Sequence, residues 1–334
     1  MKNVNNSALT FEQRIEAQKT IDQRKSTLSR YGTVLLFFGP YLFFFCLFFV
    51  YPIIQGVINS FYSYNFGNPD RIFVGWDNYH DIIIGNADIA TYKTYFDEGL
   101  LHTLYFVLLT VPFLIVVPFI LALLLNQKPW GESFFRALFF LPNVLSVSTV
   151  CILFRYVFNP QRGLIRGFNF ESDLVSAWLV LVVVTVWWTV GNNMVIMNAG
   201  LKQVDRSLYE AASIDGCSSF KQIFYITLPQ IGNQLLVCTI TTFIASFNVY
   251  GQVDLITNGG PNEQTMVFIQ RVLQLIHTTS LRSGTAGIAS AMCVLFALLI
   301  VCISLIQLYI TRDKSNSHRR IFKKQHAYVK EGAK

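Results

Sequence analysis

The chain has 334 residues, of which 53% are hydrophobic and only 13% are charged, and its mean hydropathy is +0.44. A soluble globular protein is nearer a quarter charged, so the composition excludes an ordinary soluble domain and indicates a polytopic membrane protein. The net charge of +7 could point to a nucleic-acid ligand, but the placement of the basic residues indicates membrane orientation instead.

Six segments have the length and apolar character of membrane spans. The first thirty residues are polar and charged, and the apolar run after them is longer than the core of a signal peptide, so we expect no cleavable signal. A membrane helix needs about 20 mainly apolar residues. The predicted spans lie near Tyr31–Tyr51, Leu101–Leu125, Ala137–Val157, Val175–Asn198, Ile231–Gly251 and Gly284–Ile310. The sequence therefore predicts an all-α membrane protein.

The basic residues predict the orientation of these spans. If the N-terminus is cytoplasmic, the inner segments are residues 1–30, 126–136, 199–228 and 312–334. They hold 19 of the 26 lysines and arginines, and most of these lie in the two tails. Because cytoplasmic segments carry an excess of Lys and Arg, both termini are predicted to face the cytoplasm. The expected organisation is a tail at 1–30, a six-helix domain at 31–311 and a basic tail at 312–334.

The ionisable residues favour transport that is driven from outside this chain. No Asp or Glu lies within the six predicted spans, whereas proton- and sodium-coupled carriers place such groups at membrane depth. HExxH, GxSxG and a Walker-type phosphate loop are all missing from the sequence, so we expect no enzyme activity. The six cysteines include no CxxC pair and the five histidines are scattered, so no metal site is expected.

Several polar or aromatic residues fall at mid-depth in the predicted spans. A path for a hydrophilic solute should combine hydrogen-bonding and aromatic side chains at such positions. Interhelical hydrogen bonds, or an aromatic ring that faces lipid, would explain each residue equally well. The adjacent amides at 192 and 193 are the strongest case, because buried amides are costly without partners. The candidates for the path are Asn143, Trp188, Asn192, Thr242, Ser246 and Asn248.

The polar segment before the fifth span predicts two short helices. "LYEAASIDG" is compatible with a helix, and Gly216 is well placed to end it in a left-handed conformation. Ser218 or Ser219 can cap a second helix, whose apolar residues recur at helical spacing, and Pro229 redirects the chain. The residues alone leave two interpretations open: an amphipathic helix on the lipid surface, or a docking element.

The spacing in this segment resembles a known signature. Glu210-Ala211-Ala212, three residues, Gly216, nine residues and Ile226-x-Leu228-Pro229 match all seven fixed positions of the EAA loop of ATP-binding-cassette importer permeases. In that family the loop, here about residues 199–229, forms a coupling helix that docks in a cleft of the ATPase subunit. The resemblance implies an ATPase-coupling role for Glu210, Ala211, Ala212, Asp215, Gly216, Ile226, Leu228 and Pro229.

Three further stretches are similar to the first, or F-type, permease of carbohydrate systems of the maltose, multiple-sugar and glycerol-phosphate type. They are "FVGWDNY" at 73–79, "RALFFLPNVLS" at 136–146 and "LITNGGPNEQT" at 255–265. Two features depart from the family. Asp205 stands where proline is frequent, and the first outer loop, about residues 61–99, lacks the large domain inserted in some enterobacterial maltose permeases.

The resemblance implies a type I importer fold and a subunit of an ATP-driven sugar or oligosaccharide importer in the bacterial plasma membrane. Its expected partners are a second, similar permease, two ATPase subunits, an extracytoplasmic solute-binding protein and a carbohydrate. ATP and Mg²⁺ would be bound by the ATPase, and none of the chain's own residues would hold a cofactor. The alternatives are a permease for a non-sugar solute such as glycerol phosphate, and a stand-alone channel or secondary carrier.

Overall fold

The computed structural model describes residues 34, 36–65, 70–85, 90–161, 163–165, 169–277 and 285–331, with the backbone alone at 90–91 and 310–331. The chain divides into two compact units, Met1–Asn59 and Ser60–Lys334. The described part of unit 1 is one apolar helix, Leu36–Asn59, which includes the π-helical turn η1 (Cys46–Val50) and α2 (Tyr51–Asn59). The predicted first span begins outside the described residues and ends eight residues earlier than this helix does.

Unit 2 is almost entirely helical. Its small hairpin pairs β1 (Tyr62–Ser63) with β2 (Ile72–Phe73), antiparallel, with Tyr62 opposite Phe73. The helices that follow are α3 (Asp77–Ile83), α4 (Ala90–Asn126), α5 (Glu132–Val144), α6 (Val147–Val157), α7 (Leu174–Leu201), α8 (Arg206–Ile214), α9 (Ser219–Gln222), η2 (Ile223–Thr227), α10 (Leu228–Gln230), α11 (Gly232–Phe247), α12 (Gly251–Ile256), α13 (Phe268–His277) and α14 (Thr285–Glu331).

In the described chain, four helices are long and apolar enough to cross a membrane, and two bent pairs raise the number to as many as six. The four are Leu36–Asn59, Tyr92–Asn126, Leu174–Leu201 and Thr285–Tyr309, and they correspond to the first, second, fourth and sixth predicted spans. The third predicted span corresponds to α5 and α6, which meet at an angle of 98° and pass the length and hydropathy criteria only together. In the fifth, Ser219–Gln230 and α11 meet at 75°.

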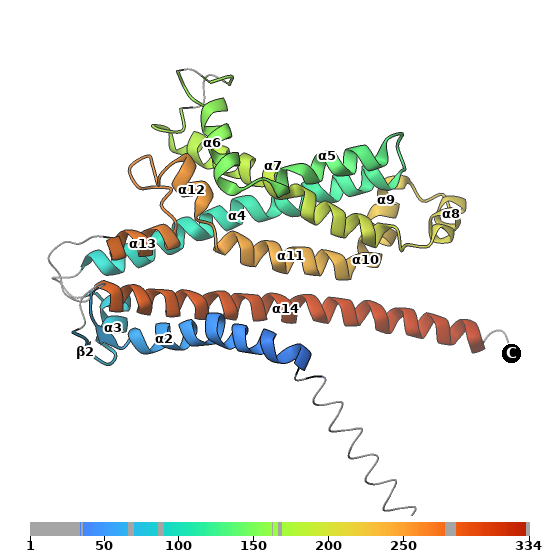
Figure 1. Cartoon of the computed structure of the whole chain (residues 1–334). Helices are drawn as coiled ribbons and strands as arrows, with labels where there is room; N and C mark the ends of the chain where they lie inside the picture. Colours follow the sequence, from blue (N-terminus) through green and yellow to red (C-terminus); the bar gives the residue numbers. More distant parts are fainter. Residues whose placement is uncertain are drawn as a thin grey trace, which may run out of the picture. The chain divides into compact units, whose positions relative to one another are not determined.

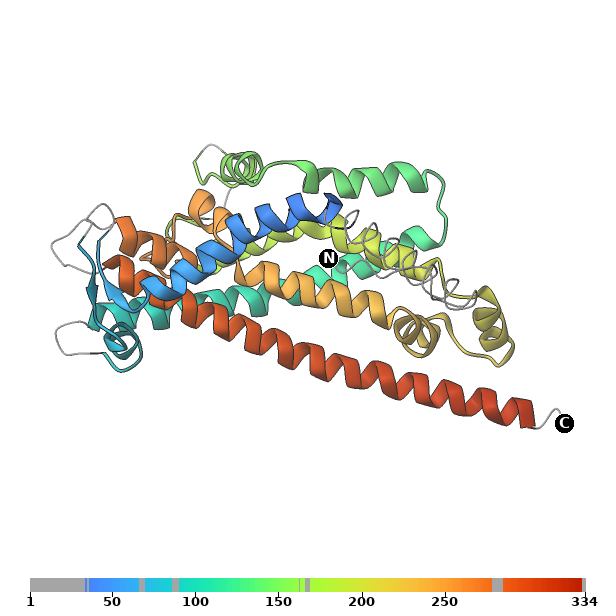
Figure 2. The ribbon, with the colours of Figure 1, turned by 60° about the horizontal axis from the view of Figure 1, so that its bottom comes forward.

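The last predicted span ends one residue after the apolar segment, which ends at Tyr309. Helix α14 continues past this segment into the expected tail, as far as Glu331. In unit 2, α14 runs alongside α11, and α8 and α13 lie toward opposite ends (Figure 1; Figure 2). The end with α8 also holds the α4–α5 connection (Figure 1). The direction of the termini relative to a membrane stays a prediction.

The core of unit 2 forms around α4 and α7. Helix α4 packs against α7, α11 and α13, α5 packs against α7, and α6 packs against α12. The contact of α5 with α7 is close because Gly191 lies directly on the backbone of Phe139 and Phe140, where a Cβ atom would collide. Buried apolar side chains fill the space between these helices, among them Phe106, Leu181 and Met197.

Candidate functional site

A polar cavity of about 590 Å³ lies among α4, α5, α7, α11 and α12. All six residues predicted for a solute path line it: Asn143 on α5, Trp188 and Asn192 on α7, Thr242 and Ser246 on α11, and Asn248 just after α11. The structure thus brings together, in one place, residues that are separated by up to 105 positions in the sequence. Their contact with a solute stays a prediction.

The hydrogen bonds divide these six residues into two groups. Thr242 accepts a bond from Asn193, Asn248 donates to the carbonyl of Ile244, and Trp188 donates to the carbonyl of Leu145. In the described part of the chain, the side chains of Asn143, Asn192 and Ser246 have no protein partner. Ser246 is 5% exposed and still reaches the cavity. Asn143 is half-buried and Asn192 is exposed at the cavity, so Ser246 is the one for which burial without a partner is costly. All three present hydrogen-bonding groups to the cavity and are the best candidates to bind a solute or ordered water.

The bend between α5 and α6 forms one wall of the cavity. Helix α5 ends at Val144, Leu145 is extended, and Ser146 caps α6 by accepting a bond from the N–H of Thr149. The indole N–H of Trp188 donates to the Leu145 carbonyl at 3.0 Å, and this carbonyl would otherwise stay open at the end of α5. Trp188 therefore stabilises the bend, a role that the sequence did not indicate.

Asn193 is structural and compensates for a proline. It is 4% exposed, and its Nδ2 donates to the Leu114 carbonyl at 2.8 Å and to Thr242 Oγ1 at 2.7 Å. Pro118 lies inside α4 and has no N–H, so the carbonyl four residues earlier, that of Leu114, lacks its usual helical partner. Both adjacent amides line the cavity. Asn193 also joins α4, α7 and α11 through its hydrogen bonds, whereas Asn192 is exposed and has no protein partner in the described chain.

The polar segment before α11 forms a compact two-helix loop. Asp205 caps α8 by accepting a bond from the N–H of Ser207, which gives a physical reason for Asp at this position. Gly216 has a φ of +74° and follows the end of α8, as the sequence predicts. The second helix starts after Ser218, passes through η2 and α10, which holds Pro229, and ends at Gln230. The chain turns there by 75° into α11, as expected of a proline that redirects it.

Hydrogen bonds join the two halves of this loop. The Tyr209 hydroxyl bonds to Thr227 Oγ1 at 3.0 Å, and Gln222 donates to Ser213 Oγ and to the Cys217 carbonyl. At its start, Lys202 forms an ion pair with Glu132 of α5 at 2.8 Å, and Glu132 also pairs with Arg136. These contacts hold α8 against the second helix and connect the loop to the start of α5.

The outer surface of the loop is apolar around a few charges. The exposed large side chains, which we call the loop patch, are Leu208, Ile214, Phe220, Phe224 and Tyr225. Glu210, Ala211, Asp215 and Gly216 are exposed, Ala212, Ile226, Leu228 and Pro229 are half-buried, and open space surrounds Gly216. A surface of this kind is typical of a site for a protein partner or a lipid surface.

A family model places the chain among transport proteins. Residues 92–316 match the family described as "Binding-protein-dependent transport system inner membrane component". The chain belongs to this family. It is therefore a multi-pass permease of the bacterial plasma membrane, and the resemblance read from the loop motif is confirmed.

Curated relatives align with this permease over most of its length. It is 26% identical to the probable ABC transporter permease YurN of Bacillus subtilis, over 80% of this chain and 94% of YurN. It is 29% identical to the multiple sugar-binding transport system permease MsmF of Streptococcus mutans, over 80% and 90%. It is 28% identical to the lactose transport system permease LacF of Rhizobium radiobacter, over 87% and 98%.

A solved structure confirms the fold of the permease. A chain of a bacterial ABC transporter for the acidic polysaccharide alginate superimposes with a TM-score of 0.71, over 88% of this chain and 99% of that chain. The identity is 19%, so this likeness concerns the fold alone. The same holds for that transporter in complex with an alginate pentasaccharide-bound periplasmic protein, where the TM-score is 0.70 and the identity 18%.

Proposed function

We propose that this permease is one transmembrane subunit of an ATP-driven importer for sugars or oligosaccharides. It would form half of the translocation path and couple to an ATPase through the loop of residues 199–229. The observation that carries the proposal is the seven-position motif, placed on two short helices around Gly216 with an exposed apolar patch beside it. Because the chain belongs to a family of transport proteins, we interpret both the cavity and the loop as parts of a transporter.

The expected partners follow from the same proposal. They are a second permease of the same family, two ATPase subunits and an extracytoplasmic solute-binding protein. The chain would not be an enzyme, and ATP with Mg²⁺ would act in the ATPase subunits. The cavity fits a carbohydrate, because amides and hydroxyls can bond to sugar hydroxyls while the Trp188 ring offers a stacking face.

A second candidate is a permease for a glycerol phosphate. The sn-glycerol-3-phosphate transport system permease UgpA of Pectobacterium atrosepticum is 25% identical to this chain over 290 residues. Uptake of labelled maltose, lactose and glycerol 3-phosphate by cells that express the complete transporter would separate the two candidates.

The coupling role is tested by Gly216→Val and Glu210→Lys in the assembled transporter. A β-branched residue at φ +74° costs about 1–2 kcal/mol, so Gly216→Val should re-aim the short helices without preventing insertion of the spans. We expect normal membrane levels with loss of ATPase co-purification, or hydrolysis that is uncoupled from uptake. Lys221→Gln, on the exposed side of α9, is the matched control.

The decisive measurements are pull-down of the ATPase, together with hydrolysis and uptake in the same proteoliposomes. If both variants keep wild-type binding, hydrolysis and uptake, the loop is not the coupling element. An amphipathic helix on the lipid surface would then replace it as the interpretation.

A further inference from the structure

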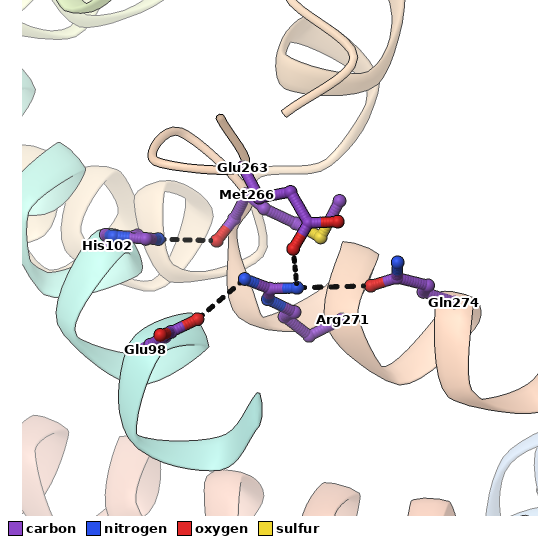
Figure 3. A network of polar contacts seen from close by, with 6 residues as sticks. All are labelled: Glu98, His102, Glu263, Met266, Arg271 and Gln274. Carbon is purple, nitrogen blue, oxygen red and sulfur yellow. Dashed lines mark hydrogen bonds and ion pairs between the residues drawn. The ribbon is translucent and has the colours of Figure 1, made fainter. Parts of the chain in front are cut away.

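Helix α13, which carries a buried arginine, lies toward the end of unit 2 opposite the two-helix loop (Figure 1). Arg271 is on α13, and its side chain is 3% exposed. Its Nη2 pairs with Glu98 of α4 at 2.7 Å, and its Nη1 pairs with Glu263 of the α12–α13 loop at 2.7 Å (Figure 3). The guanidinium also lies 4.9 Å from the centre of the Tyr95 ring. We call Arg271, Glu98 and Glu263 the arginine clamp.

The clamp joins elements that are distant in the sequence. A buried guanidinium is costly unless carboxylates and hydrogen bonds compensate it, so the position of Arg271 depends on both acids. Two contacts nearby strengthen the same junction. His102 bonds to the Met266 carbonyl at 3.0 Å, and the N–H of Phe268 donates to Thr103 Oγ1 at 2.9 Å (the first is drawn in Figure 3).

The loop held by the clamp has an unusual backbone. Asn258, Gly259, Asn262 and Glu263 all have φ between +49° and +81°. Residues other than glycine adopt this region at a cost, and such conformations persist when surrounding contacts enforce them. Inside the loop, Thr265 bonds to the Gly260 carbonyl and to the Thr257 hydroxyl. The side chain of Glu263 is held by the ion pair with Arg271.

A chain of contacts leads from this loop to the cavity. Next to Arg271 in the sequence, Gln270 donates to Asp254 of α12 at 3.3 Å. The N–H of Asp254 bonds to the Tyr250 carbonyl at 2.9 Å, and Tyr250, Gly251 and Gln252 line the cavity. The α12–α13 loop and α12 thus form a continuous segment between the clamp and one wall of the cavity.

We propose that Arg271 is a positioning residue for the cavity: by joining Glu98 of α4 to Glu263, it holds in place residues 250–266, whose first three residues line one wall. Release of the clamp loosens this segment and increases access to the cavity. The role in transport rests on the proposed function, but the positioning itself does not.

Hydrogen exchange measured on the native full-length chain in nanodiscs is the first test. Glu263→Gln removes the charge on a half-exposed side chain and nearly keeps its shape, so the protein should still fold. The amides of Gln264, Thr265 and Met266 bond within the loop. We expect them to exchange about fivefold faster in Glu263→Gln, which corresponds to about 1 kcal/mol. Asp97→Asn, one residue from Glu98 and exposed, is the matched control and should leave exchange unchanged.

The second test measures access to the cavity. In a chain whose six cysteines are replaced by alanine, Gln252→Cys is labelled with a membrane-impermeant maleimide. Glu263→Gln and Glu98→Gln should both raise the labelling rate several-fold, and Arg271→Lys should give an intermediate rate because it keeps the charge without the two-pronged geometry.

The outcomes separate this proposal from the proposed function. The positioning role is wrong if exchange in Glu263→Gln and labelling in both glutamine variants stay within twofold of the parent. It is also wrong if exchange rises equally in Asp97→Asn. If exchange and labelling respond as expected but the complete transporter shows no ATP-driven uptake of sugar, the proposed function is wrong and the positioning role of Arg271 is kept.

Discussion

The bond between Asn193 and the Leu114 carbonyl predicts an energetic coupling between Asn193 and Pro118. Asn193→Leu keeps the approximate volume of the side chain but leaves two buried acceptors, the Leu114 carbonyl and Thr242 Oγ1, without their donor. Hydrogen bonds between membrane helices contribute about 0.6 kcal/mol on average and up to about 1.7 kcal/mol. Two such bonds give an expected loss of about 1–3 kcal/mol in the free energy of unfolding.

Pro118 makes it possible to measure separately the energy of the bond between Asn193 and the Leu114 carbonyl. Pro118→Ala restores an N–H that can bond to the Leu114 carbonyl within α4. In this background, Asn193→Leu should lose only the bond to Thr242, so its cost should fall by about 1 kcal/mol. That difference is the coupling energy of a double-mutant cycle.

The assay is unfolding of the purified permease in bicelles by steric trapping, which reports the free energy of unfolding. The control is Asn192→Leu, the same substitution at the next residue, whose exposed amide has no protein partner in the described chain; it should cost less than about 0.5 kcal/mol. Two results would refute the reasoning. One is an equal cost at 192 and 193, and the other is an unchanged cost of Asn193→Leu when Pro118 is alanine.

Three further predictions concern the cavity and the clamp. Asn143→Ala, Asn192→Ala and Ser246→Ala should each lower uptake by the assembled transporter while basal ATP hydrolysis is kept; unchanged uptake in all three would remove these residues from the path. Trp188→Phe loses the indole N–H that bonds to the Leu145 carbonyl, so it should destabilise the α5–α6 bend by about 1 kcal/mol. The measurement is faster hydrogen exchange of the Leu145–Val147 amides, and Trp187→Phe is the control. The hydrogen bond from Arg271 lowers the pKa of Glu263. The clamp is therefore present above the ordinary pKa of Glu and is lost as the pH falls through the lowered pKa of Glu263. The hydrogen-exchange rates of the loop amides, corrected for intrinsic rates, should be constant from pH 7 to 5 and rise only below about pH 4. Glu98→Gln and His102→Gln are the controls for these two nearby groups.

The sequence determined the class of protein and the position of most elements. The length of the apolar runs and the scarcity of charge inside them identified membrane helices, because these properties depend on each segment alone. The turn at Gly216 was predictable for the same reason: a glycine after a short helical pattern is a local signal, and its φ of +74° confirms the prediction. The motif from Glu210 to Pro229 indicated the family, which the match over residues 92–316 confirms.

Only the tertiary structure decided which polar residues face the cavity and which hold the helices together. Asn192 and Asn193 are identical in type and adjacent in sequence, and both line the cavity, but only Asn193 is buried and bonded to α4 and α11, because successive helical residues are about 100° apart. The sequence also did not predict the bend at Leu145, the bond from Trp188 or the arginine clamp. Each depends on a contact between residues 8 to 173 positions apart, and a local sequence pattern does not indicate such a contact. Hydropathy and helical periodicity fix where a helix forms, whereas the partner that satisfies a buried carbonyl or a buried charge is chosen by packing.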